Sequence, residues 1–254
     1  MKLRHRLLGI GMRTIGRLSD GIRLGYRSGF DSGSMLEYIY ADRASGITPL
    51  GRAIDRIFLN DPVWQGVRDR RELLIGHLTR ALASAGPAAR LFDTAAGQGS
   101  YLFALQPGDH IAGDRSGAEV QRGNRRAEAA GRMDIRFVLA DAFDPSTWPG
   151  APFDVVVSSG FFDILTDSAD VERLLDAGSA GTRPGARWVL TLMERHPKLD
   201  LLRDVLVDFD GRPWVAVTRS IDEVMTLAQP RGWRLDAVNR ERRGFFAVAT
   251  LVRA

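Results

Sequence analysis

The stretch Leu91-Phe-Asp-Thr-Ala-Ala-Gly-Gln-Gly99 decides how the rest of this sequence is interpreted. It places an acidic residue, Asp93, at the end of a short apolar run and two glycines in the turn that follows. Glycine has no Cβ, so the chain can turn tightly there and a ligand can approach the backbone. The N–H groups at the start of the next helix are then available to an anionic ligand group. Taken alone, the turn is as consistent with an ordinary structural turn as with a binding loop.

Short β-like runs alternate with helical stretches from residue 89 to the end of the sequence. This alternation is typical of a parallel sheet covered by helices on both faces. We predict seven strands, at residues 90–95, 110–114, 135–140, 153–158, 187–193, 233–239 and 245–252. We predict helices from Ser100 onward and at 117–130, 169–178, 197–208 and 221–229. The expected fold class is α/β, a doubly wound, seven-stranded, mostly parallel Rossmann-like sheet that binds ligands at the carboxyl ends of its strands.

The first third of the chain contains no comparable strands. We predict helices within residues 1–24 and at 35–44, 49–59 and 63–82, with a Gly- and Ser-rich turn at 25–33. Thr48 followed by Pro49 is a favourable pair for starting one of these helices. Residues 1–82 are therefore expected to form an N-terminal helical cap or lid, and residues 83–254 the ligand-binding domain.

The composition narrows the protein class. Apolar residues make up 44% and charged residues 26% of the 254 residues, as in a globular protein with a real core. We find neither an apolar run long enough to cross a bilayer nor a secretory signal, so a cytoplasmic location is expected. The sequence has no cysteine and its four histidines show no metal-ligand spacing, so no metal is expected.

The basic residues are concentrated near the N-terminus. Residues 1–80 hold 14 Lys and Arg against 8 Asp and Glu, and nearly all of the bases are Arg. Such an Arg bias can reflect codon composition, so a nucleic-acid partner is not expected. Residues 1–27 combine seven basic residues with one acid and interspersed Leu and Ile, so peripheral membrane contact is one interpretation. Packing of this segment on its own domain is the favoured one, and the sequence does not indicate an oligomeric state.

The spacing of later acidic residues makes the glycine turn more informative. Asp114 lies 17 residues after Gly97, at the end of the second predicted strand and directly before Arg115. A carboxylate there can accept hydrogen bonds from ribose hydroxyls, although it could also simply begin the next helix. Asp141-Ala142 ends the third predicted strand, where a base edge would be contacted. Three acids at the ends of three successive strands favour an adenosine-containing ligand.

The pattern Asp-x-Ala-x-Gly-x-Gly at 93–99 resembles motif I of class I S-adenosylmethionine-dependent methyltransferases, with Ala95 in place of the first glycine. The resemblance implies S-adenosylmethionine as cofactor, bound by the motif residues Asp93, Ala95, Gly97 and Gly99, with the two glycines beside its methionine part. It also implies that Asp114 holds the ribose and that Asp141-Ala142 flanks the adenine. Arg115, next to Asp114, and Ser159 are predicted to bind the cofactor as well. A nicotinamide dehydrogenase fits less well, because Leu102 breaks the Gly-x-Gly-x-x-Gly spacing.

Nearly the whole chain resembles one bacterial family of class I methyltransferases, which is sometimes fused to hydrolase or phospholipid-synthase domains. The resemblance rests on segments at 21–25, 29–33, 48–56, 141–144, 159–165, 196–199 and 214–220. Two segments depart from the family pattern. The family has an acidic, Tyr-containing segment where this chain has Phe161-Phe162-Asp163, and Gln-Pro-Trp-His-Pro where this chain has 193–197. The substrate is therefore not carried over from the family.

Residues after the fourth and fifth predicted strands are the candidates for chemistry. Ser159, Phe161, Phe162 and Asp163 follow the fourth strand, where methyltransferases face the transferred group. An aromatic face attracts a sulfonium cation by about 0.5–2 kcal/mol, although both rings could equally be core residues. Asp163 could bind a substrate amine, act as a base or cap a helix. His196 could deprotonate a nucleophile as a neutral imidazole, or it could be structural.

Three functions remain open at this point. The favoured one is transfer of a methyl group from S-adenosylmethionine to an oxygen or nitrogen of a small molecule or lipid. Methyl transfer is a direct displacement that depends mainly on orientation and on exclusion of water. The second is cyclisation of S-adenosylmethionine to azetidine-2-carboxylate with release of methylthioadenosine. The third is a non-catalytic, membrane-associated cofactor-binding module.

Overall fold

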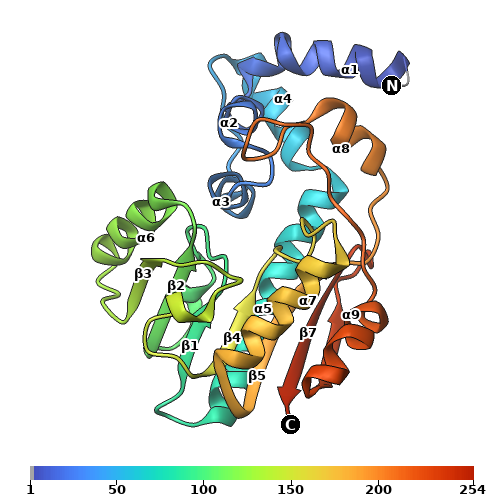
Figure 1. Ribbon diagram of the computed structural model, residues 1–254. Coiled ribbons are helices and arrows are strands. Elements are labelled where there is room, and N and C mark those ends of the chain that lie inside the picture. The colour runs from blue at the N-terminus through green and yellow to red at the C-terminus, as the bar shows by residue number, and fades with distance from the viewer. Residues whose placement is uncertain (1–2) are drawn as a thin grey trace. The chain divides into compact units, whose positions relative to one another are not determined.

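The computed structural model describes residues 3–254, and the chain divides into two compact units (Figure 1). The helical unit comprises the chain up to Arg68 together with His196–Val217. The sheet unit comprises Asp69–Arg195 and Thr218–Ala254. This division differs from the predicted boundary after residue 82, which falls inside one continuous helix, α5 (Pro62–Ala85). The segment after the fifth strand also belongs with the N-terminal helices rather than with the sheet.

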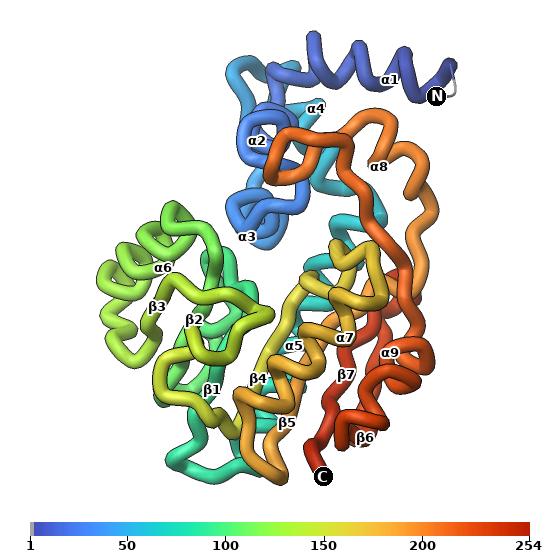
Figure 2. The backbone as a smooth tube through the Cα atoms, viewed as in Figure 1, coloured from blue at the N-terminus to red at the C-terminus, as the bar shows by residue number. Residues whose placement is uncertain are grey.

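The sheet unit is built on seven strands in the order β3-β2-β1-β4-β5-β7-β6 (Figure 2). The strands are β1 (Arg90–Asp93), β2 (Asp109–Asp114), β3 (Ile135–Leu139), β4 (Phe153–Ser158), β5 (Thr182–Met193), β6 (Trp233–Arg240) and β7 (Phe246–Arg253). The first five strands pair in parallel, and β7 runs antiparallel to both β5 and β6. Strand order reverses between β1 and β4, which is where doubly wound sheets bind ligands. The predicted fold class is confirmed.

Helices cover both faces of this sheet. They are the part of α5 from Asp69 onward, α6 (Gly117–Ala129), α7 (Ser168–Ala180) and α9 (Ile221–Ala228), with short 3-10 turns η2 (Leu102–Ala104), η3 (Pro145–Thr147) and η4 (Gln229–Arg231). Successive strand residues point to opposite faces. Phe92 accordingly packs in a core with α7 and α9, and Leu91 packs in a second core with α5 and η2.

Two predicted elements of the sheet unit differ from the structure. The helix expected from Ser100 is only the single turn η2, because Pro107 and Gly108 come soon after Ala104 and β2 begins at Asp109. Strand β5 begins five residues earlier than expected, at Thr182. Its pairing with β4 changes register there, and Gly185 has a positive φ of 80°. A β-bulge of this kind lets a strand continue through a Pro-Gly pair.

The helical unit contains no long strand among its described residues and is built from helices. They are α1 (Leu3–Arg13), the 3-10 turn η1 (Ile15–Leu18), α2 (Asp20–Ser28), α3 (Gly33–Ala41), α4 (Pro49–Leu59), the beginning of α5, and α8 (Leu199–Val205). Of the predicted helix at 1–24, the first two residues lie outside the described part of the chain. The expected turn at 25–33 is wrong in its first half, because α2 continues to Ser28.

Local hydrogen bonds explain this boundary. Ser19 starts α2 by accepting a hydrogen bond from Ile22 N at 3.0 Å, and Ser28 donates to Leu24 O at 2.9 Å within its last turn. Ser32 then starts α3 by accepting from Met35 N at 3.2 Å. The true turn is therefore only the short link between Ser28 and Gly33, with Gly29 at a φ of 89°.

One buried carboxylate, Asp55 of α4, connects several helices of the helical unit and is fully inaccessible to solvent. It accepts hydrogen bonds from the hydroxyls of Ser19 and Tyr38 at 2.5 Å each, and from the N–H groups of Gly21 and Ser45 at 2.9 Å each. Four donors satisfy the carboxylate's acceptor capacity, so its burial costs little. This network joins α2, α3 and α4.

Candidate functional site

The glycine loop predicted from the sequence connects β1 to η2 at the carboxyl edge of the sheet. Gly97 and Gly99 have φ values of 54° and 53°, in the left-handed region where a side chain is strained. A Cβ on Gly99 would also lie 3.1 Å from Leu102 and 3.3 Å from the Phe137 ring. The N–H of Ala96 donates to Gly113 O at 2.9 Å, which fixes the loop against the end of β2. Glycine is therefore required here both for backbone conformation and for space.

Asp93, the first residue of the motif, holds the glycine loop in place through buried hydrogen bonds. Its side chain is fully buried, and it accepts hydrogen bonds from the Tyr101 hydroxyl and from Ala95 N, the latter at 3.3 Å. Burial raises the pKa of Asp93 to about 7, while the Tyr101 and Ala95 hydrogen bonds oppose the rise and the charge of Asp114 adds to it. A carboxyl group so enclosed positions the loop, and its predicted part in binding the cofactor stays a prediction.

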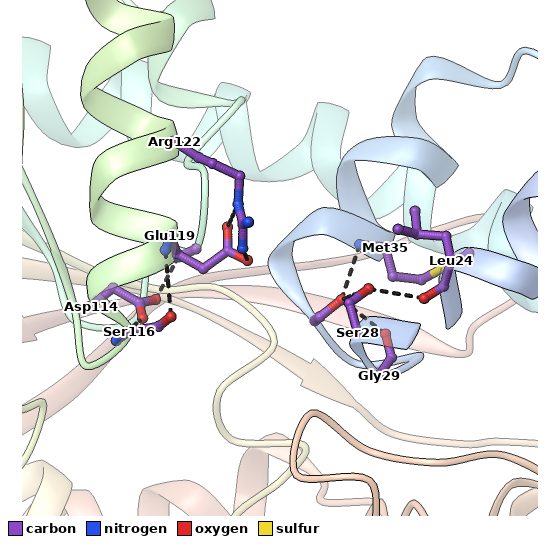
Figure 3. Close-up of polar contacts among 10 residues, drawn as sticks. Leu24, Ser28, Gly29, Met35, Asp114, Ser116, Glu119 and Arg122 are labelled. Carbon is purple, nitrogen blue, oxygen red and sulfur yellow. Dashed lines mark hydrogen bonds and ion pairs between the residues drawn. The ribbon is translucent and has the colours of Figure 1, made fainter. Parts of the chain in front are cut away.

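Asp114 at the end of β2 joins two loops of the site. One carboxylate oxygen accepts from Gly97 N at 2.8 Å and the other from Ser116 N at 2.7 Å. Figure 3 shows Asp114 beside Ser116, which in turn accepts from Glu119 N at the start of α6. The Asp114 carboxyl is partly exposed, and desolvation raises its pKa. Each of its oxygens keeps a second lone pair, so the group can also accept ligand hydroxyls.

The other residues predicted around an adenosine lie on exposed loops beside these. The Arg115 side chain is exposed after β2. After β3, Asp141 is exposed and accepts from Phe143 N at 2.9 Å, whereas Ala142 is buried. The Trp148 indole N–H donates to Asp141 O at 2.9 Å, which fixes the backbone of this loop. The loops after β1, β2 and β3 leave the same edge of a parallel sheet, so these positions converge as expected.

The loop after β4 is anchored to the core by hydroxyl groups. Ser158 is buried, accepts from the Trp188 indole N–H at 3.0 Å and lies 2.8 Å from the Thr94 hydroxyl. Two residues later, Gly160 N donates to the Thr191 hydroxyl at 2.7 Å. Ser159 lies between these anchors with its side chain half-buried. The loop therefore has one fixed backbone path next to the glycine loop of β1.

The two predicted aromatic residues of this loop have different positions. Phe162 is fully buried and packs edge-on against Trp188, with ring centroids 6.2 Å apart. Its ring therefore belongs to the core, which was one of the two possibilities considered from the sequence. Phe161 stays partly exposed and packs near Phe143 at 5.7 Å between centroids. Of the pair, Phe161 is the ring whose position suits contact with a ligand.

Asp163 is held in a buried polar network. One oxygen accepts from Met193 N at 2.7 Å, and the other lies 3.3 Å from the Arg70 guanidinium of α5. Burial raises the pKa of Asp163, and the nearby charges of Arg70 and Arg219 oppose the rise. Arg219 also donates to Phe162 O at 2.8 Å. These contacts tie the β4 loop to α5 and to the end of β5, so Asp163 acts through the loop that it positions.

His196 belongs to the helical unit and not to the sheet unit that carries the other candidates. Its Nδ1 accepts from Lys198 N at 3.0 Å. Burial lowers its pKa to about 4, with Asp61 raising and Lys198 further lowering it. The ring is therefore neutral at pH 7, and because Nδ1 accepts, the proton lies on Nε2. In this tautomer neither nitrogen is free to take a proton, which argues against the general-base role considered above.

Several residues that shape the site could not be recognised from the sequence. Tyr101, Trp188, Thr191 and Arg70 each bind a site residue, yet none belongs to a recognisable motif. A buried Tyr eight positions after the motif acid is the only one with a local signal. The others reach the site from α5 and β5, which are distant in sequence.

Comparison with known proteins gives one curated relative and several solved structures. The chain is 32% identical over 264 aligned residues to the uncharacterized protein YnbC of Escherichia coli K12, covering 99% of this chain and 45% of that protein. The chain thus spans about half the length of this relative. A possible exported protein from Bordetella parapertussis has a TM-score of 0.68 at 19% identity, covering 87% of this chain and 79% of the other.

Magnesium protoporphyrin IX methyltransferase from Synechocystis, solved with bound SAH, has a TM-score of 0.63 at 13% identity. The match covers 90% of this chain and 98% of that one, and it supports the methyltransferase type of fold. A family model with the description "Putative methyltransferase" matches residues 1–253. The resemblance to a methyltransferase family seen in the sequence is thereby confirmed. Because the match extends over nearly the whole sequence, this chain belongs to that methyltransferase family.

Proposed function

We propose that the chain binds S-adenosylmethionine at the carboxyl ends of β1–β4 and transfers its methyl group to an oxygen or nitrogen of a small-molecule or lipid acceptor. The observation that carries this proposal is the position of Asp114. Its carboxylate fixes the glycine loop through Gly97 N at 2.8 Å and still has lone pairs for two ribose hydroxyls. A single acid that both shapes the loop and accepts hydroxyls fits a nucleoside ligand.

The neighbouring loops fit the remaining parts of the cofactor. The left-handed backbone at Gly97 and Gly99 lets the methionine part approach closely, without side chains between. The exposed Asp141 and buried Ala142 fit an adenine edge and face. Phe161 offers a partly exposed ring to the sulfonium, an attraction of about 0.5–2 kcal/mol. S-adenosylmethionine supplies the reactive methyl group when bound, and the protein orients it and excludes water.

The reaction is tested by incubating the purified chain with S-adenosylmethionine, alone and with candidate small-molecule or lipid acceptors. Mass spectrometry then identifies the adenosine-containing product. Methyl transfer predicts S-adenosylhomocysteine that forms only with an acceptor. Methylthioadenosine formed without any acceptor would instead establish cyclisation. Binding without either product would favour the non-catalytic alternative. A cytoplasmic location for this activity stays a prediction.

The cofactor site is tested by Asp114→Ala, with binding measured by calorimetry. Losing hydrogen bonds to a charged group typically costs about 1.5–3 kcal/mol, so we expect S-adenosylmethionine affinity to fall about 10- to 150-fold. Asp236→Ala is the matched control, because Asp236 is an exposed acid on β6 at the far edge of the sheet. Equal affinity of the two variants would contradict the assignment of Asp114.

A further inference from the structure

Helix α1 has one packed face and one exposed face. On the packed face, His5 Nδ1 lies 2.8 Å from Asp204 of the α8 segment, and Gly9 is buried where an added Cβ would lie 3.8 Å from the Val205 side chain. On the opposite side, Leu3, Leu7 and Ile10 are 72%, 62% and 54% exposed. Their spacing of four and three residues places them on a single helical stripe. The helix therefore turns three large apolar side chains into solvent although it is anchored to its own unit.

Arginines flank this apolar stripe on both sides. Arg4, Arg6 and Arg13 are exposed, and at 100° per residue they lie on either side of the Leu3–Leu7–Ile10 stripe. The sequence has no Asp or Glu before Asp20, so no acid on α1 offsets these charges. An exposed apolar stripe bordered by arginines is the pattern of a helix that lies in the interface of an anionic membrane. A helix that only covers its own unit needs the packed face alone.

The elements that adjoin α1 also carry exposed apolar side chains, and η1 carries an exposed arginine. In η1, Ile15 is 61% exposed and Arg17 is exposed. The turn η1 is bonded to the segment before α4, through Ile47 N to Leu18 O at 3.0 Å, and Ile47 is itself 64% exposed. Figure 1 shows η1, between α1 and α2, at the same end of the helical unit as the segment that enters α4. These three elements therefore adjoin one another along the chain's fold, and each carries exposed apolar residues.

The first turns of α4 add a shallow hollow of about 360 Å³ to this region. It is lined by Ala44, Pro49, Arg52, Ala53 and Arg56. The Arg56 guanidinium forms an ion pair with the Asp42 carboxylate, with Nη1 and Oδ1 3.5 Å apart. Arg52, by contrast, has no carboxylate partner within the described chain. Leu50 beside it is exposed. A guanidinium beside an exposed apolar side chain suits a phosphate headgroup above acyl chains.

We propose that this region, formed by the outer face of α1, by η1 and by residues 43–52, docks the protein on an anionic lipid bilayer. Charge decides between this occupant and a second copy of the chain. A two-fold contact would bring the same arginine-bordered stripes together, and like charges would then oppose each other. With anionic headgroups, each arginine instead raises the affinity of the protein for the bilayer about fivefold. The apolar side chains meanwhile enter the membrane interface. Among the described residues no helix has the length and apolarity to cross a bilayer, so the contact is peripheral.

Vesicle co-sedimentation of the full chain tests this proposal. We expect binding to phosphatidylcholine vesicles that contain phosphatidylglycerol, weakening as salt is added, and little binding to phosphatidylcholine alone. Leu7→Glu should weaken binding at least tenfold. Met133→Glu is its control, because Met133 is 74% exposed in the sheet unit and distant in sequence from α1. Both replacements are at exposed positions, and a matching thermal transition verifies that each variant is folded.

A second pair of variants tests the charges separately. Arg4→Ala with Arg6→Ala should weaken binding by on the order of tenfold and reduce its salt dependence. The control is the double variant Arg125→Ala with Arg234→Ala, which replaces two exposed arginines of the sheet unit. It should change neither the vesicle binding nor its salt dependence. The proposal fails if anionic and neutral vesicles bind equally or not at all, or if Leu7→Glu and Met133→Glu behave alike. It also fails if light scattering shows a dimer that Leu7→Glu dissociates while vesicles are not bound.

Discussion

The buried carboxyl group of Asp93 makes stability depend on pH in a way that one replacement should remove. Asp93→Asn keeps the shape of the side chain and places an amide between Tyr101 and Ala95. Its carbonyl can accept from Ala95 N, and its NH2 can donate to the Tyr101 oxygen. The amide does not titrate, so this variant isolates the ionisation of a single buried group.

The size of the effect follows from the pKa of Asp93, which burial raises from an ordinary value of 3.8 to about 7. Between these values the folded protein keeps a proton that the unfolded chain has lost. Stability contributed by this group is therefore fully present below pH 3.8 and is lost as pH rises through 7. From pH 5 to pH 8 the expected loss is about 2–3 kcal/mol.

The assay is urea unfolding of both proteins at pH 5 and pH 8. Other titrating groups are shared by the two proteins, so the difference between their pH dependences reports Asp93 alone. The wild type should lose about 2–3 kcal/mol more than Asp93→Asn over this range. Parallel pH dependences would refute the reasoning, because they would mean that Asp93 titrates alike in the folded and unfolded chain.

Two further predictions concern packing and charge in the sheet unit. Gly178→Ala would place a Cβ against the Trp188 ring and should cost about 1–3 kcal/mol, whereas Gly117→Ala, facing open space at the start of α6, should be neutral or stabilising. Urea midpoints compare the two, and equal midpoints would contradict the packing argument. Asp163→Ala should cost about 3–5 kcal/mol by leaving Arg70 buried without its partner. Adding Arg70→Met should restore part of this loss in the same measurement, and a double variant less stable than Asp163→Ala would disprove the pairing.

Much of the sheet was predictable because the signals for it are local. Strand β4 has the predicted bounds, Phe153–Ser158, since a short run of β-branched valines bounded by turn residues favours a buried strand. Helix α4 also has its predicted bounds, because Thr48 and Pro49 fix its start. The prediction of a helix from Ser100 was wrong. The residues there are compatible with a helix, but Pro107 and strand β2 leave room for a single turn only.

The candidate site was predictable in position but not in the roles of its residues. Asp114 and the glycine loop lie where the spacing placed them, because parallel strands deliver their carboxyl ends to one edge. The burial of Phe162 and the tautomer of His196 depend on partners that no spacing rule identifies. The same holds for Asp163, whose partner Arg70 lies 93 residues earlier in the chain.

The class of fold, the family resemblance and the loop at 91–99 could all be inferred from the amino-acid sequence, since they follow from hydrophobic period, glycine placement and strand-end spacing. Tertiary structure decided which acids are buried and which accept a ligand, because burial and hydrogen-bond partners come from distant segments. It also decided that the segment 196–217 packs with the N-terminal helices. The arginine-bordered apolar stripe on α1 could be identified only from both, because the sequence supplies the Leu and Arg pattern and packing against α8 shows which face stays in solvent.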